Sequence, residues 1–161
     1  MIPIFFEQAV EPLIELPVDG DNRTLIALDI PKCYKHKMFK IDAFFELNFL
    51  VGAGLNNELN QSQNLPFVIG LNYQLFNGLG EICTELTPRL AETISGTVIF
   101  NQELETDPII EFESNTTPNL TIIAGGLSFD TLNLVANITR IEGGVVLPFV
   151  NFRSMNVSVI N

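Results

Sequence analysis

The stretch that decides the fold is Phe39-Lys40-Ile41-Asp42-Ala43-Phe44-Phe45-Glu46-Leu47-Asn48-Phe49, in which every odd position is apolar. The even positions are charged or amide side chains, with Phe44 as the exception. A period of two is typical of a β-strand with one buried face and one face in water, and no helical spacing fits it. The stretch therefore predicts a long strand whose odd residues enter the core.

The same alternation returns along the chain, in runs separated by Gly, Pro and Asn turn signals. Asn77-Gly78 predicts a tight hairpin turn after the run 67–75. A slip in apolar parity between Phe152 and Met155 predicts a β-bulge near Arg153. With about eight to ten such runs, the economical fold is all-β, an antiparallel β-sandwich or jelly roll.

Two segments depart from this pattern. Thr87–Ser95, with Pro88 in its first turn, is the one candidate for a short helix. Gly52–Asn64 is polar and without periodicity, which predicts an exposed loop suited to contacts.

The length of 161 residues suits one domain. Within it, residues 1–21 carry Pro3, Pro12 and Pro17, and proline cannot donate to a strand ladder. We therefore expect an N-terminal extended arm or edge strand over 1–21 and a jelly-roll sandwich over 22–161. The sequence does not separate an arm that packs on its own sheet from one that adds to another subunit.

Charge and hydropathy argue against two classes of partner. The chain has 8 basic and 19 acidic residues, a formal charge of −11, which repels nucleic acid and anionic lipid. No apolar run reaches the roughly 20 residues needed to span a bilayer. The start of the chain lacks a basic segment and has Glu7 and Glu11 where an apolar run would stand, so no secretory signal is visible.

Residue types that carry chemistry are scarce. His36 is the only histidine, there is no tryptophan, and no catalytic or phosphate-loop motif occurs. The pairs Glu103/Glu105 and Glu111/Glu113 have strand spacing and fit the wet side of a sheet better than a catalytic pair. Asp19-Gly20-Asp21-Asn22 is the best local candidate for calcium, but these residues are also what a turn requires. We expect no enzyme activity, no catalytic residues, no metal and no cofactor.

All the lysines lie within nine residues of one another on an otherwise acidic chain. They are solubilising charges ahead of an apolar strand, or a basic patch that docks on the acidic surface of a neighbouring copy. The sequence leaves both options open. The candidate subunit-contact residues are Lys32, Lys35, Lys37 and Lys40.

Cys33 and Cys83 are too few for a disulfide framework and have no metal-ligand spacing. Three fates are open: an internal disulfide, buried free thiols, or cross-links between subunits. Six Asn-x-Ser/Thr sequons occur, and they fit the wet face of strands as well as glycosylation.

The alternating strand at 39–47, the run 67–75 and the closing runs 132–138 and 149–160 resemble the small jelly-roll proteins of Bacillus-type spore surfaces, from the exosporium and spore appendages. The chain is also similar in pattern to the tumour-necrosis-factor and C1q type of jelly roll. It lacks the collagen-like repeat and the cysteine-rich N-terminal connector of the spore proteins. The resemblance implies two packed antiparallel sheets and self-assembly into trimers or fibres.

The sequence therefore favours a non-enzymatic structural protein that assembles as a homo-oligomer on a spore or other cell surface, with synthesis in the cytoplasm compatible with the missing signal. The alternative is a carbohydrate- or receptor-binding β-sandwich module using the 52–64 loop, so that a surface glycan or a partner structural protein is a further candidate partner. The scarcity of polar aromatic residues argues mildly against sugar stacking.

Overall fold

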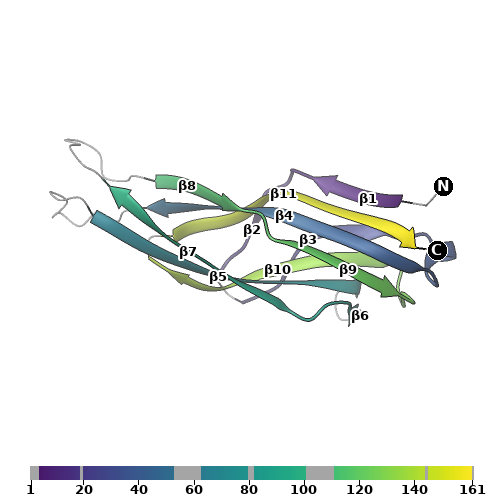
Figure 1. The fold of residues 1–161 in the computed structure, drawn as a ribbon. Helices are drawn as coiled ribbons and strands as arrows, with labels where there is room; N and C mark the ends of the chain where they lie inside the picture. Colours follow the sequence, from purple (N-terminus) through teal and green to yellow (C-terminus); the bar gives the residue numbers. More distant parts are fainter. Residues whose placement is uncertain are drawn as a thin grey trace.

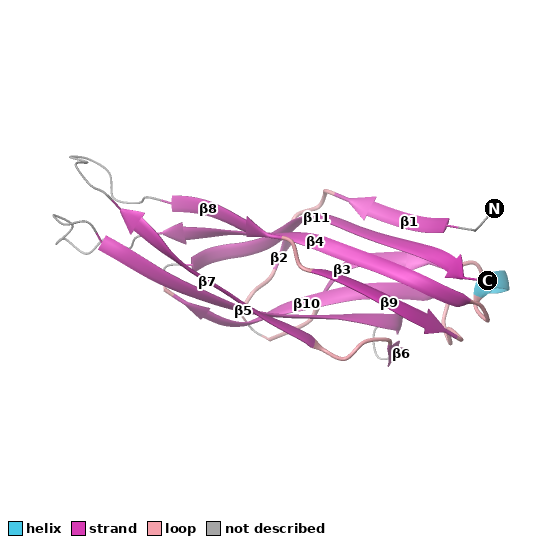
Figure 2. Ribbon diagram, viewed as in Figure 1, coloured by secondary structure: helices cyan, strands magenta, loops and turns pink. Residues whose placement is uncertain are grey.

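The computed structural model is built almost entirely of β-strands in two antiparallel sheets that pack face to face (Figure 2). The one helix in the described part is a single 3-10 turn, η1 (Lys32–Tyr34). The predicted all-β sandwich is confirmed. The structure describes residues 4–18, 20–52, 63–79, 82–100, 111–143 and 145–160.

The first sheet, sheet A, has β11 and β4 at its centre, with shorter strands on either side (Figure 1). It consists of β1 (Ile4–Ala9), β2 (Ile14–Glu15), β4 (Met38–Gly52), β8 (Glu111–Thr116), β9 (Asn119–Gly125) and β11 (Val145–Ile160).

The second sheet, sheet B, has β10 and β5 at its centre. It consists of β3 (Arg23–Asp29), β5 (Gln63–Leu79), β6 (Ile82–Glu85), β7 (Leu90–Phe100) and β10 (Thr131–Glu142).

In three places, two consecutive short strands lie end to end and pair with the same long strand, as one interrupted strand would. β1 and β2 follow one another along β11, β6 and β7 along β5, and β8 and β9 along β4. The described strands therefore form eight columns, in which the first pairs with the eighth, the second with the seventh, the third with the sixth and the fourth with the fifth. This nested antiparallel pairing is the topology of a jelly roll.

β4 contains the deciding stretch, and its odd residues form the centre of the core. Phe39, Phe45 and Phe49 are no more than 1% exposed. Across the gap between the sheets, Phe45 meets Tyr73 of β5 edge to face at 5.6 Å, and Phe49 meets Phe67 at 5.4 Å. Burial of these rings is the main stabilising contribution of the strand.

The N-terminal segment is an edge of the sandwich, because β1 and β2 both pair with β11 of the same chain. The bulge predicted near Arg153 is confirmed, since the register between β11 and β4 shifts between Val150 and Arg153. Arg153 is 4% exposed, and its Nη2 donates to the carbonyl of Glu11 at 3.1 Å. The bulge thereby ties β11 to the segment between β1 and β2.

The helix predicted over Thr87–Ser95 is wrong, because residues 90–95 belong to β7. That strand pairs with β5 along eleven residues. Burial alternates along this strand: Leu90, Glu92 and Ile94 are partly buried, and the residues between them are exposed. This strand period outweighs the helix-start signal at Pro88. The edge of β5 requires a partner, and tertiary pairing overrides local propensity.

The hairpin turn predicted at Asn77-Gly78 is wrong, because both residues belong to β5. β5 continues through both residues to Leu79, and pairing resumes at Ile82. Asn77 is 1% exposed, and its side chain braces the chain between β9 and β10: Oδ1 accepts from the amide of Phe129 at 2.9 Å, and Nδ2 donates to the carbonyls of Phe129 and Thr131. The Asn-Gly pair is thus used as an internal strut, with φ of +114° at Gly78.

Candidate functional site

The four lysines lie in η1, just after it and at the start of β4. This 3-10 turn lies at the end of the sandwich near the C-terminus (Figure 2). Two of them are held within the chain: Lys35 forms an ion pair with Asp130, and Lys40 lies 3.0 Å from Asp42. Lys32 and Lys37 are exposed. The basic patch is therefore smaller than the sequence indicates, since half of its charge is balanced locally.

Cys33 and Cys83 are both exposed, and neither forms a disulfide in the structure. Cys33 lies in η1, and Cys83 lies in β6 at the edge of sheet B. The fate as buried thiols does not hold for either residue, and the two are not joined to each other. Exposure leaves them accessible to thiol–disulfide exchange.

The other sequence candidates do not converge on a site. Within the described residues, no three acidic, histidine or cysteine side chains gather as metal ligands would. Asp19, the pair Glu103/Glu105 and residues 53–62 of the predicted loop fall outside the described residues, as do the side chains of Glu111 and Glu113.

At one of the six sequons the asparagine side chain is buried in the fold. Asn137 is 4% exposed and its Nδ2 donates to the carbonyl of Gly20 at 2.5 Å, so the folded protein cannot accept a glycan there. No helix in the part of the chain that the structure describes is long and apolar enough to cross a membrane.

The feature that stands out is the outer face of sheet A, which turns apolar side chains to solvent. The strand register places four rows of outward residues across β1, β11, β4 and β9. The row of Ile4 continues with Ser158, Lys40 and Ile123; the row of Phe6 with Asn156, Asp42 and Thr121; the row of Gln8 with Ser154, Phe44 and Asn119; the last row holds Ile160, Met38 and Gly125.

Five of these outward side chains are large, apolar and substantially exposed. Phe6 and Ile123 are each 66% exposed, and the set is completed by Ile4, Met38 and Ile160. Phe44 and Phe152 extend the apolar surface further along the sheet, with their rings 5.3 Å apart. Several large apolar side chains exposed on one face, set among polar ones, are typical of the surface of an interaction site.

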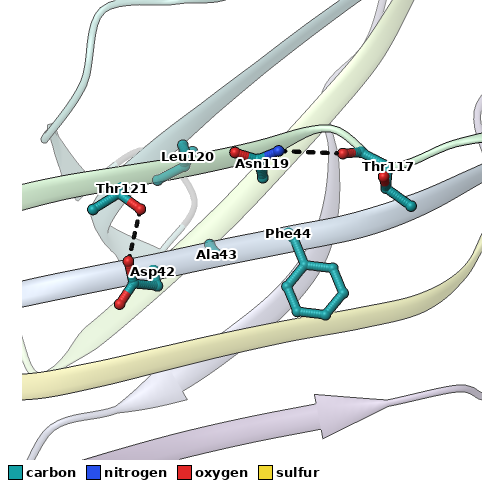
Figure 3. A pocket seen from close by; sticks show the side chains of 7 residues that line it. All are labelled: Asp42, Ala43, Phe44, Thr117, Asn119, Leu120 and Thr121. Atoms are coloured by element: carbon teal, nitrogen blue, oxygen red, sulfur yellow. Dashed lines mark hydrogen bonds between the residues drawn. The ribbon is translucent and has the colours of Figure 1, made fainter.

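A hollow of about 290 Å³ opens on this face where β8 gives way to β9 (Figure 3). The break comes at Pro118, which lacks the amide that a continuous ladder needs. Phe44 supplies an apolar wall, while Asp42 and Thr121 form a polar margin. The lining residues are Asp42, Ala43, Phe44, Thr117, Asn119, Leu120 and Thr121.

The polar margin of the hollow is internally satisfied. The Thr121 hydroxyl donates to Asp42 Oδ1 at 2.7 Å. This bond, more than the neighbouring Lys40, holds the pKa of Asp42 below its ordinary value against the opposing effect of burial. Asp42 is thus ionised, and within the four rows its charge is balanced by Lys40.

A second hollow, of about 220 Å³, lies on the outside of sheet B. Phe76 and Val135 form its apolar part, and Cys83 lies in its wall. Asn133 also lines it; this side chain is 3% exposed and its Oδ1 has no partner within the described structure. An unpartnered buried amide oxygen is uncommon and is suited to receiving a donor from a ligand or water.

Sequence reasoning missed the outer face of sheet A because its apolar side chains come from separate strands. Only Ile4 and Phe6 lie on the same strand at period two, and the even positions of β4 are mostly polar. The available signal was Ile122-Ile123. Neighbouring residues of a strand face opposite sides of the sheet, so one of these two large apolar side chains must face outward.

No protein-family model matches the chain, and no curated protein matches it. Among solved structures, the chain is similar to the structure of infectious bursal disease virus Gt strain, with 12% identity and a TM-score of 0.28, covering 99% of this chain and 42% of that one. It is also similar to the structure of the Gx strain, with 13% identity, a TM-score of 0.26 and the same coverage, and to the crystal structure of the VP2 subviral particle of that virus, with a TM-score of 0.24. The chain spans about two fifths of the length of these structures, and likeness at these scores carries no argument about its function.

Proposed function

We propose that this protein is a non-enzymatic structural jelly roll that assembles with copies of itself, on a spore or other cell surface. The observation that carries the proposal is the outer face of sheet A, whose exposed apolar side chains no described element covers. Removing such side chains from water favours association in proportion to the apolar area buried. Trimers, fibres and surface layers are all compatible with one such face combined with a second contact.

The exposed cysteines support a role in stabilising an assembly after it forms. Cys33 lies in η1 and Cys83 in β6 at the edge of sheet B, so disulfides between copies would link molecules in more than one direction. The step is thiol–disulfide exchange with a small disulfide, which takes up the two electrons and leaves as two thiols.

The size of the particle in solution tests the proposal. We expect sedimentation velocity and light scattering to show oligomers that grow with protein concentration, and negative-stain imaging to show discrete particles or fibres. A Cys33→Ser/Cys83→Ser variant should keep this association and lose only the fraction that resists denaturant without reductant. A protein that stays monomeric up to millimolar concentration, with and without reductant, would overturn the proposal.

The hollow on sheet B favours a second candidate function, binding of a carbohydrate or similar polar ligand. It pairs the half-buried Phe76 ring with the amides and hydroxyl of Asn22, Thr24 and Asn133, groups that suit sugar hydroxyls. Glycan-array binding that disappears in Phe76→Ala and persists in Phe44→Ala, on the other sheet, would favour this function. Absence of binding to any glycan would remove it.

A further inference from the structure

The hollow and the exposed phenylalanine on sheet A lie at matching places. Phe6 projects from β1 at one edge of the sheet, and the hollow opens beside β9 at the other edge. The strand register places both at the same position along the strands, since one row across the sheet consists of Phe6, Asn156, Asp42 and Thr121. The distance between the edges prevents Phe6 from filling the hollow of its own chain, because three strand spacings of about 4.8 Å separate them.

We propose that two copies of this chain pack through the outer faces of sheet A about a two-fold axis that runs parallel to the strands, between β11 and β4. This inference rests on the proposed self-assembly and specifies its contact. This two-fold rotation places β1 of one copy opposite β9 of the other, and each row of residues keeps its position along the strands. Phe6 of each copy then enters the hollow of the other, and Ile4 of each meets Ile123 of the other.

The hollow is large enough for this guest. A closed cavity of about 150 Å³ holds a benzene molecule. The hollow of about 290 Å³ therefore has room for a phenyl ring beside Phe44. Offset or edge-to-face contact between two phenylalanine rings adds about 0.5–1.5 kcal/mol beyond the area buried.

Charge favours a second copy as the occupant. A chain with a formal charge of −11 repels its own copies over most approaches. In these four rows the charged side chains are Lys40 and Asp42, which already pair at 3.0 Å. The two-fold operation places β4 over β11, so that Lys40 meets the row position of Ser158 and Asp42 that of Asn156. The two copies' Lys40 side chains then lie one strand spacing, about 4.8 Å, apart across the axis, as do their Asp42 side chains, and each lysine keeps the Asp42 of its own chain as its partner.

The area is adequate for a specific but reversible contact. Four columns about 4.8 Å apart and four rows about 6.7 Å apart give a footprint of about 500 Å² per copy. Two copies then bury about 1,000 Å², the size at which specific interfaces begin. A two-fold axis across the strands would bury a similar area but would set hollow against hollow, leaving both empty.

Substitution on the face tests the contact, with a matched control on β6. Phe6→Ser should weaken dimerisation at least tenfold in sedimentation equilibrium, and Thr121→Arg should do the same by filling the hollow. Ile82→Ser changes a side chain of similar exposure, 69% against 66% for Phe6, that lies on sheet B, and should leave dimerisation unchanged. Melting followed by circular dichroism checks that all three variants fold.

Photo-cross-linking tests the geometry directly. With p-benzoylphenylalanine in place of Phe6, irradiation should give a dimer whose cross-linked peptide lies within 117–124. The same residue in place of Ile4 should react around Ile123, and in place of Ile82 should give no dimer.

The outcomes separate the two proposals. Association of wild-type strength in Phe6→Ser, or cross-links from position 6 to β1 of the other copy, would overturn this contact while leaving self-assembly in place. A wild-type protein that remains monomeric would overturn both.

Discussion

The Phe44-Phe45 pair allows a direct test of how β4 specifies the fold, because neighbouring rings of the same kind face opposite sides of the sheet. Phe45 is 0% exposed and touches Tyr73 across the core, whereas Phe44 is half-buried on the outer face against Phe152. Truncating a buried phenylalanine to alanine removes about 3–5 kcal/mol from the free energy of unfolding. Truncating Phe44 should remove about 1 kcal/mol, because its ring is only partly buried.

The difference is large against the total stability expected of one domain, about 5–15 kcal/mol. At about 2–4 °C per kcal/mol for a chain of this size, Phe45→Ala should lower Tm by about 6–20 °C and Phe44→Ala by about 2–4 °C. Urea unfolding followed by far-ultraviolet circular dichroism measures both free energies. It should be run at low protein concentration, because Phe44 borders the hollow and a dimer would add stability.

Equal losses in the two variants would refute the reasoning, since they would mean that both faces of β4 are equally buried. A loss below about 1 kcal/mol in Phe45→Ala would refute it as well, because no core phenylalanine with this exposure should be dispensable.

Three further predictions concern single polar side chains. Asn77→Asp should lower the free energy of unfolding by about 3 kcal/mol in urea titration, because a carboxylate cannot donate to the carbonyls that Asn77 Nδ2 now contacts, those of Phe129 and Thr131. Wild-type stability in this variant would contradict the assignment. The pKa of Tyr73 is raised, first by burial and then by its hydrogen bond to Glu92, so the stability it contributes is complete below about pH 10 and falls as the pH rises further. Tyr73→Phe should therefore flatten the alkaline loss of stability, and an unchanged slope above about pH 10 would count against the assignment. Arg153→Ala should speed hydrogen exchange in residues 4–15 relative to the rest of sheet A, because the guanidinium bond to the connection between β1 and β2 is lost; uniform exchange would argue against that tie.

The sequence predicted the elements that depend on a local period and failed where a distant partner decides. The alternation at 39–49 and the parity slip near Arg153 follow from the two-residue repeat alone, and both are confirmed. Thr87–Ser95 became a strand because β5 offers it an edge, and Asn77 became a strut because Phe129, more than fifty residues away, needs a partner. Neither edge nor partner is visible in a local window.

The candidate site follows the same division. The lysine cluster is conspicuous in the sequence, yet Asp130 and Asp42 neutralise half of it in the fold. The apolar outer face of sheet A is inconspicuous in the sequence because it combines β1, β4, β9 and β11, and it exists only once the register is set. Cross-strand rows are properties of the sheet rather than of any strand.

The nested strand pairing also determines when each strand can find its partner while the chain is being synthesised. β11 lies between β1 and β4 and is the last of the described strands to leave the ribosome. Until residues 145–160 emerge, β1 and β2 have no strand to pair with and one edge of β4 stays open. Pairings at such sequence separation form slowly, so an unfinished chain exposes strand edges and core side chains that the finished chain covers. Early association of incomplete chains is therefore the characteristic hazard of this topology, and a high net negative charge is one means of keeping such chains apart.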